Sequence, residues 1–151
     1  MQTRRETLKH SAIVAGLLAT TGLFPHYAQA YNKPAFEAKS VVDVLKALGA
    51  GAPAESKDVT ITGPDLAENG AVVHFTIGTA LPGVKRMLLL VEKNPFTLVA
   101  LFNVTDSVEA NFAIRSKMGQ SSSVYAVAIM NDGRALFARK EVKVTLGGCG
   151  G

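Results

Sequence analysis

The residues of this sequence that could carry chemistry gather around a single cysteine, Cys149. Two glycines stand on each side of it, so the segment reads Gly147-Gly148-Cys149-Gly150-Gly151. A thiolate is a nucleophile, and glycine has no side chain that could pack over the sulfur. Glycine also loses more conformational entropy on ordering than any other residue. We therefore expect residues 147–151 to form a flexible arm with an exposed thiol.

This segment is poorly suited to catalysis by its own chain. A catalytic cysteine needs a base and oxyanion-stabilising groups held in a fixed geometry, which a glycine arm cannot provide. A covalent carrier needs the opposite: a reactive atom, a flexible tether and little bulk beside it. Five extended residues reach at most about 16 Å beyond the preceding strand. The sequence thus predicts a carrier rather than an enzyme, with Cys149 as the attachment point and Gly147, Gly148, Gly150 and Gly151 giving flexibility.

Two other roles for Cys149 stay open. An odd cysteine in an exported chain can form an intermolecular disulfide, which would make this an interaction protein. It could also deliver a metal together with His or Met ligands. However, His74 lies in an apolar run and is interpreted as a strand residue, and the scattered Met87, Met118 and Met130 are interpreted as core. We predict neither a metal site nor a cofactor.

The first 30 residues predict an export signal. Arg4 and Arg5 precede an apolar run over residues 11–24, and Ala28-Gln29-Ala30 supplies small residues at cleavage-site spacing. We expect cleavage after Ala30. The segment around Arg4 and Arg5 resembles the twin-arginine signal, which exports folded cargo, so we predict a periplasmic protein. The apolar run is shorter than the roughly 20 residues that cross a bilayer, and no membrane association is expected.

Composition excludes other classes. The chain has 151 residues, 48% hydrophobic and 19% charged, which fits one globular domain. Its formal charge is +4, but Arg4, Arg5 and Lys9 against Glu6 account for +2, so little positive charge remains elsewhere to bind nucleic acid. One cysteine excludes an internal disulfide. We expect a signal peptide at 1–30, a helix plus β-sandwich at 31–146 and the arm at 147–151.

Periodicity predicts one short helix followed by strands. Val41, Val44, Leu45 and Leu48 recur at helical spacing, which indicates a helix near residues 35–48 with Gly49 as its stop. Residues 49–57 are interpreted as a connection. Alternating or apolar runs then predict seven strands, at residues 59–62, 72–77, 87–91, 98–104, 111–116, 124–130 and 135–146.

The connections between these strands are short. Asn131-Asp132-Gly133 is a strong hairpin signal, Glu92-Lys93-Asn94-Pro95 is interpreted as a structural turn, and Ser121-Ser122-Ser123 as a polar loop. Residues 87–91 are apolar throughout, as in a strand buried on both faces. Short strands without intervening long helices predict an immunoglobulin-like antiparallel β-sandwich with a short N-terminal helix. A small barrel is the alternative.

The segment Val142-Lys143-Val144-Thr145-Leu146-Gly147-Gly148-Cys149-Gly150-Gly151 resembles the C-terminus of SoxY, the sulfur-carrier subunit of the periplasmic thiosulfate-oxidising (Sox) system. Residues 91–95 and 114–133 also resemble that family. Family members often carry a second proline after the Asn-Pro turn, where this chain has Phe96-Thr97-Leu98. The likeness extends over nearly all of residues 31–151 and is strongest from residue 87 onward.

The resemblance implies a domain that pairs with a second β-sandwich subunit, SoxZ, as a heterodimer. It also implies that a c-type cytochrome complex joins the thiolate of Cys149 oxidatively to thiosulfate. A hydrolase would then release sulfate, and a sulfane dehydrogenase would oxidise the persulfide-type sulfur left on Cys149. A second hydrolysis would regenerate the thiol. In this scheme the carrier is a covalent substrate of its partner enzymes and needs no cofactor of its own.

Overall fold

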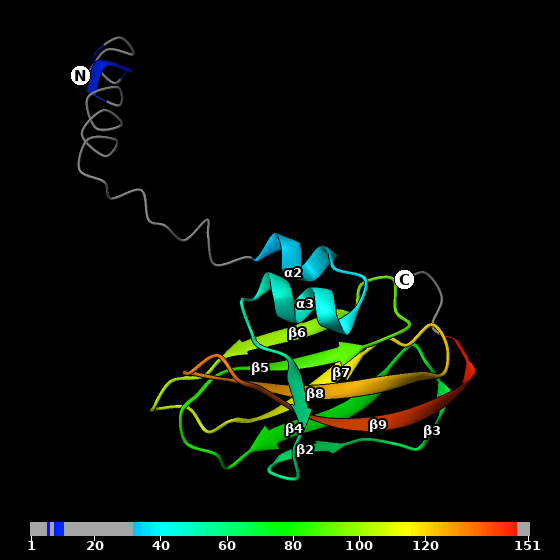
Figure 1. The fold of residues 1–151 in the computed structure, drawn as a ribbon. Helices are drawn as coiled ribbons and strands as arrows, with labels where there is room; N and C mark the ends of the chain where they lie inside the picture. The colour runs from blue at the N-terminus through cyan, green and yellow to red at the C-terminus, as the bar shows by residue number, and fades with distance from the viewer. Residues whose placement is uncertain (1–5, 7, 11–31, 148–151) are drawn as a thin grey trace. The chain divides into compact units, whose positions relative to one another are not determined.

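The computed structural model describes residue 6, residues 8–10 and residues 32–147 of the chain (Figure 1). The chain divides into two units, Met1–Tyr31 and Asn32–Gly151. The predicted signal peptide and its cleavage site therefore fall almost wholly outside the described residues. Across the described part of the chain, no helix combines the length and the apolar character needed to cross a membrane.

Two short helices begin the second unit, where the sequence predicted one helix over 35–48. They are α2, Lys33–Glu37, and α3, Val41–Ala47. Ala38 is extended after α2, and Ser40 is extended before α3, where its Oγ accepts a hydrogen bond from the Asp43 amide at 3.1 Å. The prediction of one continuous helix was wrong because Ser40 acts as an N-cap and starts a new helix. Gly49, with φ of 70°, follows α3 as the expected stop.

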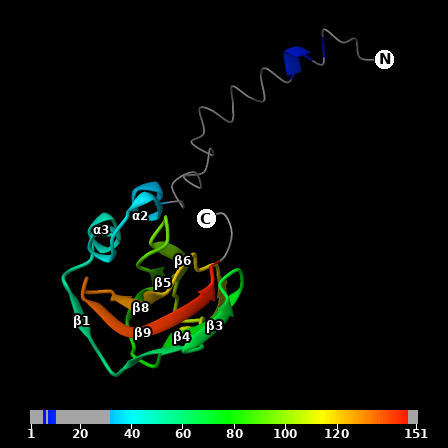
Figure 2. The ribbon, with the colours of Figure 1, turned by 90° about the vertical axis from the view of Figure 1, so that its right-hand side faces the viewer.

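The strands of the second unit form a β-sandwich (Figure 2). The larger sheet has the order β1-β9-β8-β5-β6, with β3 also paired to β9, and the smaller sheet has the order β2-β4-β7. The strands are β1 Pro53–Glu55, β2 Val59–Thr62, β3 Leu66–Asn69, β4 Val73–Thr79, β5 Val84–Val91, β6 Leu98–Asn103, β7 Asn111–Ser116, β8 Ser122–Met130 and β9 Ala135–Leu146.

The predicted β-sandwich and its seven strands are confirmed, with small shifts at strand ends. The hairpin between β8 and β9 is also confirmed, and Gly133 takes a φ of 89° in its turn. Two further strands, β1 and β3, were not predicted. Both pair with β9 in parallel, whereas the other ladders are antiparallel. Each is short and mostly exposed, so neither carries an apolar alternation that sequence reasoning could detect.

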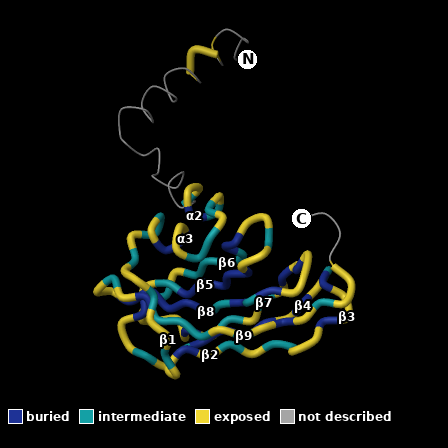
Figure 3. Tube along the Cα trace, turned by 45° about the vertical axis from the view of Figure 1, so that its right-hand side comes forward, coloured by how far each residue is buried: buried dark blue, intermediate teal, exposed yellow. Residues whose placement is uncertain are grey.

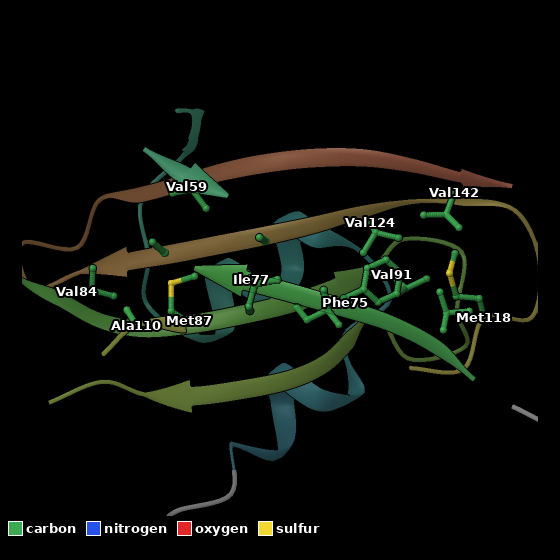
Figure 4. Packing of buried hydrophobic residues seen from close by; sticks show 14 of the residues in the cluster. Val59, Phe75, Ile77, Val84, Met87, Val91, Ala110, Met118, Val124 and Val142 are labelled. Atoms are coloured by element: carbon green, nitrogen blue, oxygen red, sulfur yellow. The ribbon is translucent and has the colours of Figure 1, made fainter. Parts of the chain in front are cut away.

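The apolar residues form two layers. Phe75 and Ile77 of β4 point toward Met87 and Val91 of β5 between the sheets (Figure 4). Leu88 of β5 faces the opposite way and packs in a second cluster with residues of α2 and α3. Residues 87–91 of β5 are therefore buried on both faces, as their unbroken apolar sequence predicted (Figure 3). The core assignment of the methionines is confirmed, since Met87, Met118 and Met130 are all buried.

Gly63 provides a test of how tightly this core is packed. A Cβ added there would lie 2.6 Å from a ring carbon of Phe75, whose side chain is buried. Because the ring is packed within the core cluster, we expect Gly63→Ala to destabilise the domain by about 1–3 kcal/mol in chemical denaturation. In Gly51→Ala the new Cβ would meet its nearest atom at 3.4 Å, so this control should cost less than about 0.5 kcal/mol. Equal stability of the two variants would contradict the packing argument.

Candidate functional site

Gly147 is the predicted arm residue that the structure describes. Cys149, Gly148, Gly150 and Gly151 lie outside the described residues, as do Arg4 and Arg5 of the predicted export signal. The structure thus describes the point from which the cysteine-bearing segment departs. We call Leu146 and Gly147, which follow directly from β9, the arm root.

Strand β3 holds one edge of β9 up to the arm root. Asn69 is the register partner of Leu146 in this parallel ladder. At the start of the ladder the Lys143 amide donates to the Asp65 carbonyl at 2.9 Å, and at its end the Gly70 amide donates to the Leu146 carbonyl at 2.7 Å. The backbone of Leu146 is therefore fixed, although its side chain is exposed.

The loop of residues 117–121 holds the other edge. The Val144 amide donates to Ser121 Oγ at 2.9 Å, beyond the point where the β8 ladder stops at Ser122. Gly147 then comes so close to this loop that a Cβ on it would lie 2.2 Å from the Gly119 carbonyl oxygen. Real Cβ atoms do not approach backbone atoms this closely, so glycine is required at 147 by the space available.

This loop is itself fastened to the predicted Asn-Pro turn. Asn94 Nδ2 donates to the Lys117 carbonyl at 2.7 Å, and the Gly119 amide donates to Asn94 Oδ1 at 3.4 Å. The Met118 side chain is buried between the sheets, and its amide donates to the Gly70 carbonyl at 2.7 Å. The loop is thereby joined to the turn after β5, to the core and to the chain just after β3.

The serine run, which was predicted to be a polar loop, is largely the start of β8. Its side chains connect neighbouring segments: Ser122 Oγ accepts from the Lys93 amide at 3.0 Å, and Ser123 Oγ donates to Glu141 of β9. Sequence reasoning missed these roles because the bonding partners lie far away in the chain. The spacing of the three serines gave no sign of them.

An ion pair adds an electrostatic contact between β9 and the chain just before β3. Lys140 of β9 contacts the carboxylate of Asp65, which lies just before β3. The hydrogen bond and charge of Lys140 lower the pKa of Asp65 below its ordinary value of 3.8. The same Asp65 receives the Lys143 amide through its backbone, so both contacts join the start of β3 to β9.

Of the other candidate ligands, Met118 is buried and lies in the loop of residues 117–121 that contacts the arm root. His74 is an exposed residue of β4, in register with Arg115 of β7. Within residues 6, 8–10 and 32–147 there is no group of three or more His, Cys, Asp or Glu residues placed to hold a metal ion.

The fold and this site define an immunoglobulin-like β-sandwich protein whose longest strand leads into a glycine-flanked cysteine. Residues 44–149 match the model of the family described as sulfur oxidation protein SoxY, and this match includes Cys149. The chain belongs to the SoxY family. Its membership gives it a role in sulfur oxidation.

A solved structure agrees with this assignment, and a second one shares the fold. The sulfur carrier protein SoxY from Chlorobium limicola f thiosulfatophilum is 30% identical with a TM-score of 0.61, over 70% of this chain and 96% of that one. A superoxide reductase (neelaredoxin) from Ignicoccus hospitalis is 20% identical with a TM-score of 0.51, over 57% of this chain and 79% of that one. The likeness to the reductase shows the fold alone. No curated protein matches the sequence.

The Asp65–Lys140 pair predicts a pH dependence. A carboxylate whose pKa is lowered on folding stabilises the protein above its unfolded pKa, and this stabilisation is lost as the pH falls through the lower, folded pKa. We therefore expect Asp65→Asn to lower the free energy of unfolding near neutral pH, with the difference from wild type vanishing well below pH 3.8. Urea denaturation over a pH series measures this. In a Lys140→Gln background the same substitution should show no such pH-dependent difference; if it does, the pair is not the cause.

Proposed function

We propose that this protein is a periplasmic sulfur carrier in which the Cys149 thiolate bears thiosulfate-derived intermediates on a flexible arm. The observation that carries the proposal is the family match, which extends through the arm root to Cys149. The hydrogen bonds that hold β9 up to Leu146 support it, because a tether works best from a firm base. Glycine at 148, 150 and 151 supports it as well, since a chain without side chains can enter a narrow active-site channel.

In the proposed cycle the carrier supplies only the sulfur atom of Cys149, and the partner enzymes supply the other reactive groups. The Cys149 thiolate and the outer sulfur of thiosulfate form an S–S bond with the loss of two electrons, which a c-type cytochrome complex accepts. Water then cleaves the bond to the sulfone, releasing sulfate and two protons and leaving a persulfide on Cys149. A sulfane dehydrogenase oxidises that outer sulfur with three water molecules, releasing six protons and passing six electrons to a c-type cytochrome acceptor. A final hydrolysis releases sulfate and restores the thiol.

The chain's own residues do not catalyse these steps in the proposal. Cys149 anchors the sulfur covalently and the residues after the arm root move it between enzymes. The carrier is therefore a substrate of the cytochrome complex, the sulfate-releasing hydrolase and the dehydrogenase. We further propose that it acts as a heterodimer with a SoxZ-like β-sandwich subunit. The family's place in a Sox system supports this partnership.

The proposal predicts a sulfur adduct on one residue. Intact mass under non-reducing conditions, on periplasmic protein from cells grown with thiosulfate, should show a thiosulfonate or persulfide addition that a reductant removes. The addition should map to the peptide containing Cys149 and should be absent without thiosulfate. Cys149→Ser is the matched control, since it removes one sulfur atom and leaves the glycines intact.

Two results would overturn the proposed role of Cys149 as a sulfur carrier. Protein that stays unmodified in every condition has no carrier role under thiosulfate growth. Protein recovered only as a disulfide-linked dimer, with or without thiosulfate, would instead establish the interaction role through Cys149.

We also propose export by the twin-arginine pathway, which the sequence of residues 1–30 supports. Changing Arg4 and Arg5 together to lysine keeps the positive charge but removes the guanidinium groups. We expect the variant to remain in the cytoplasm with its signal uncleaved, as judged by fractionation and immunoblot, while wild type appears in the periplasm at lower mass. Normal export of the double-lysine variant would point to the general secretory route.

A further inference from the structure

We infer that Gly147 belongs to the rigid domain and that the arm pivots at Gly148, so that the contact between Gly147 and Gly119 sets where the moving tether begins. The inference deepens the proposed carrier function and rests on it for its meaning. It also makes Asn94, which lies far from Cys149 in the sequence, a positioning residue for the arm.

The first support is the continuity of bonding up to the arm root. The carbonyl of Leu146 accepts from the Gly70 amide at 2.7 Å, so β9 remains bonded on the β3 side through its last residue. On the other side Ser121 Oγ accepts from the Val144 amide at 2.9 Å. A backbone bonded from both sides over these residues has few open conformations left.

The second support is the packing of Gly147 itself. Its Cα lies where an added Cβ would be 2.2 Å from the oxygen and 3.1 Å from the carbonyl carbon of Gly119. Both neighbouring atoms belong to the backbone, so the contact cannot relax by rotation of a side chain. A residue that needed only flexibility at this position would not show such a close approach. Gly147 is therefore a packing glycine, and its role differs from that predicted for the glycines that follow.

The third support is that the surface facing Gly147 is anchored. Asn94 bonds the loop at both the Lys117 carbonyl, 2.7 Å away, and the Gly119 amide, 3.4 Å away. Between these two points Met118 is wholly buried, which fixes the loop to the core. Because these contacts hold Gly119 in place, its carbonyl group limits the movement of Gly147.

The consequence is a shorter and better directed tether. Moving the pivot from 147 to 148 removes one residue, or about 3.3–3.6 Å, from the fully extended reach of the cysteine. A shorter tether from a fixed base confines the thiol to a smaller volume and raises its effective concentration within that volume. Asn94 contributes to this by holding Gly119 in place.

Backbone amide order parameters from ¹⁵N relaxation test the inference residue by residue. In the reduced wild-type protein we expect Gly147 to match the rigid strand β9, at about 0.85, and the values to fall below about 0.6 beyond Gly148. In Gly147→Ala the new Cβ must displace the backbone, so the values at Leu146 and residue 147 should fall toward those of the tether. Gly119→Ala is the matched control, because a Cβ on Gly119 meets no described atom within 4 Å.

Asn94→Ala tests the anchor by a second route, should Gly147→Ala fail to fold. We expect the order parameter at Gly147 to fall while the values at the middle of β9 stay unchanged, which separates loss of positioning from general destabilisation. Asn94→Asp retains the acceptor for the Gly119 amide but loses the donor to Lys117, and should give an intermediate value. A wild-type value below about 0.6 at Gly147, or an unchanged value in both Gly147→Ala and Asn94→Ala, would overturn the inference.

These measurements use no sulfur compound and no partner enzyme. If these measurements contradict the inference, a pivot at Gly148 is excluded. The proposed sulfur-carrier function is then still tested separately, by the intact-mass experiment. Conversely, absence of a sulfur adduct on Cys149 would overturn the carrier function even if Gly147 proved rigid.

Discussion

The bonding of strand β9 on both of its edges is the constraint on which the rest of this structure depends. One edge pairs with β8 from Ala135 to Val142, and the other pairs in parallel with β1 at its start and β3 at its end. Beyond the end of the β8 ladder, Ser121 Oγ accepts a hydrogen bond from the Val144 amide. The strand is thus a rigid support that runs from the β8–β9 hairpin to the residues preceding the cysteine.

Burial of β5 and most of β8, two neighbouring strands of the larger sheet, gives that support its stiffness. Residues of β5 such as Leu89 pack between the sheets, while their neighbours such as Leu88 pack with residues of α2 and α3. Since β8 lies between β5 and β9, the two apolar layers immobilise the strand to which β9 is bonded. The connection between α2 and α3 also contacts the turn that holds the loop beside the arm root, since Lys39 Nζ donates to the Pro95 carbonyl at 2.6 Å.

Glycine has two physical roles in one short motif. At 147 it permits two backbones to approach more closely than any side chain would allow, which is a requirement of packing. At 148, 150 and 151 the proposed role is freedom of the backbone and absence of bulk. A substitution to alanine therefore has different consequences at neighbouring positions, although the sequence presents the glycines as equivalent. The Asn94 turn shows the same principle, since a local turn motif also positions a loop distant in the chain.

Sequence patterns within short segments were sufficient to predict much of the fold and the family of this protein. Alternation, the unbroken apolar run of β5 and the Asn131-Asp132-Gly133 turn predicted seven strands and the sandwich, and the segment around Cys149 indicated the family. Only the tertiary structure decided that Ser40 divides the predicted helix, that β1 and β3 add in parallel to β9, and that Gly147 rests on Gly119. The break at Ser40 comes from a local cap with Asp43. The other features arise from pairing between segments far apart in the chain, where burial and backbone hydrogen bonding outweigh weak local preferences.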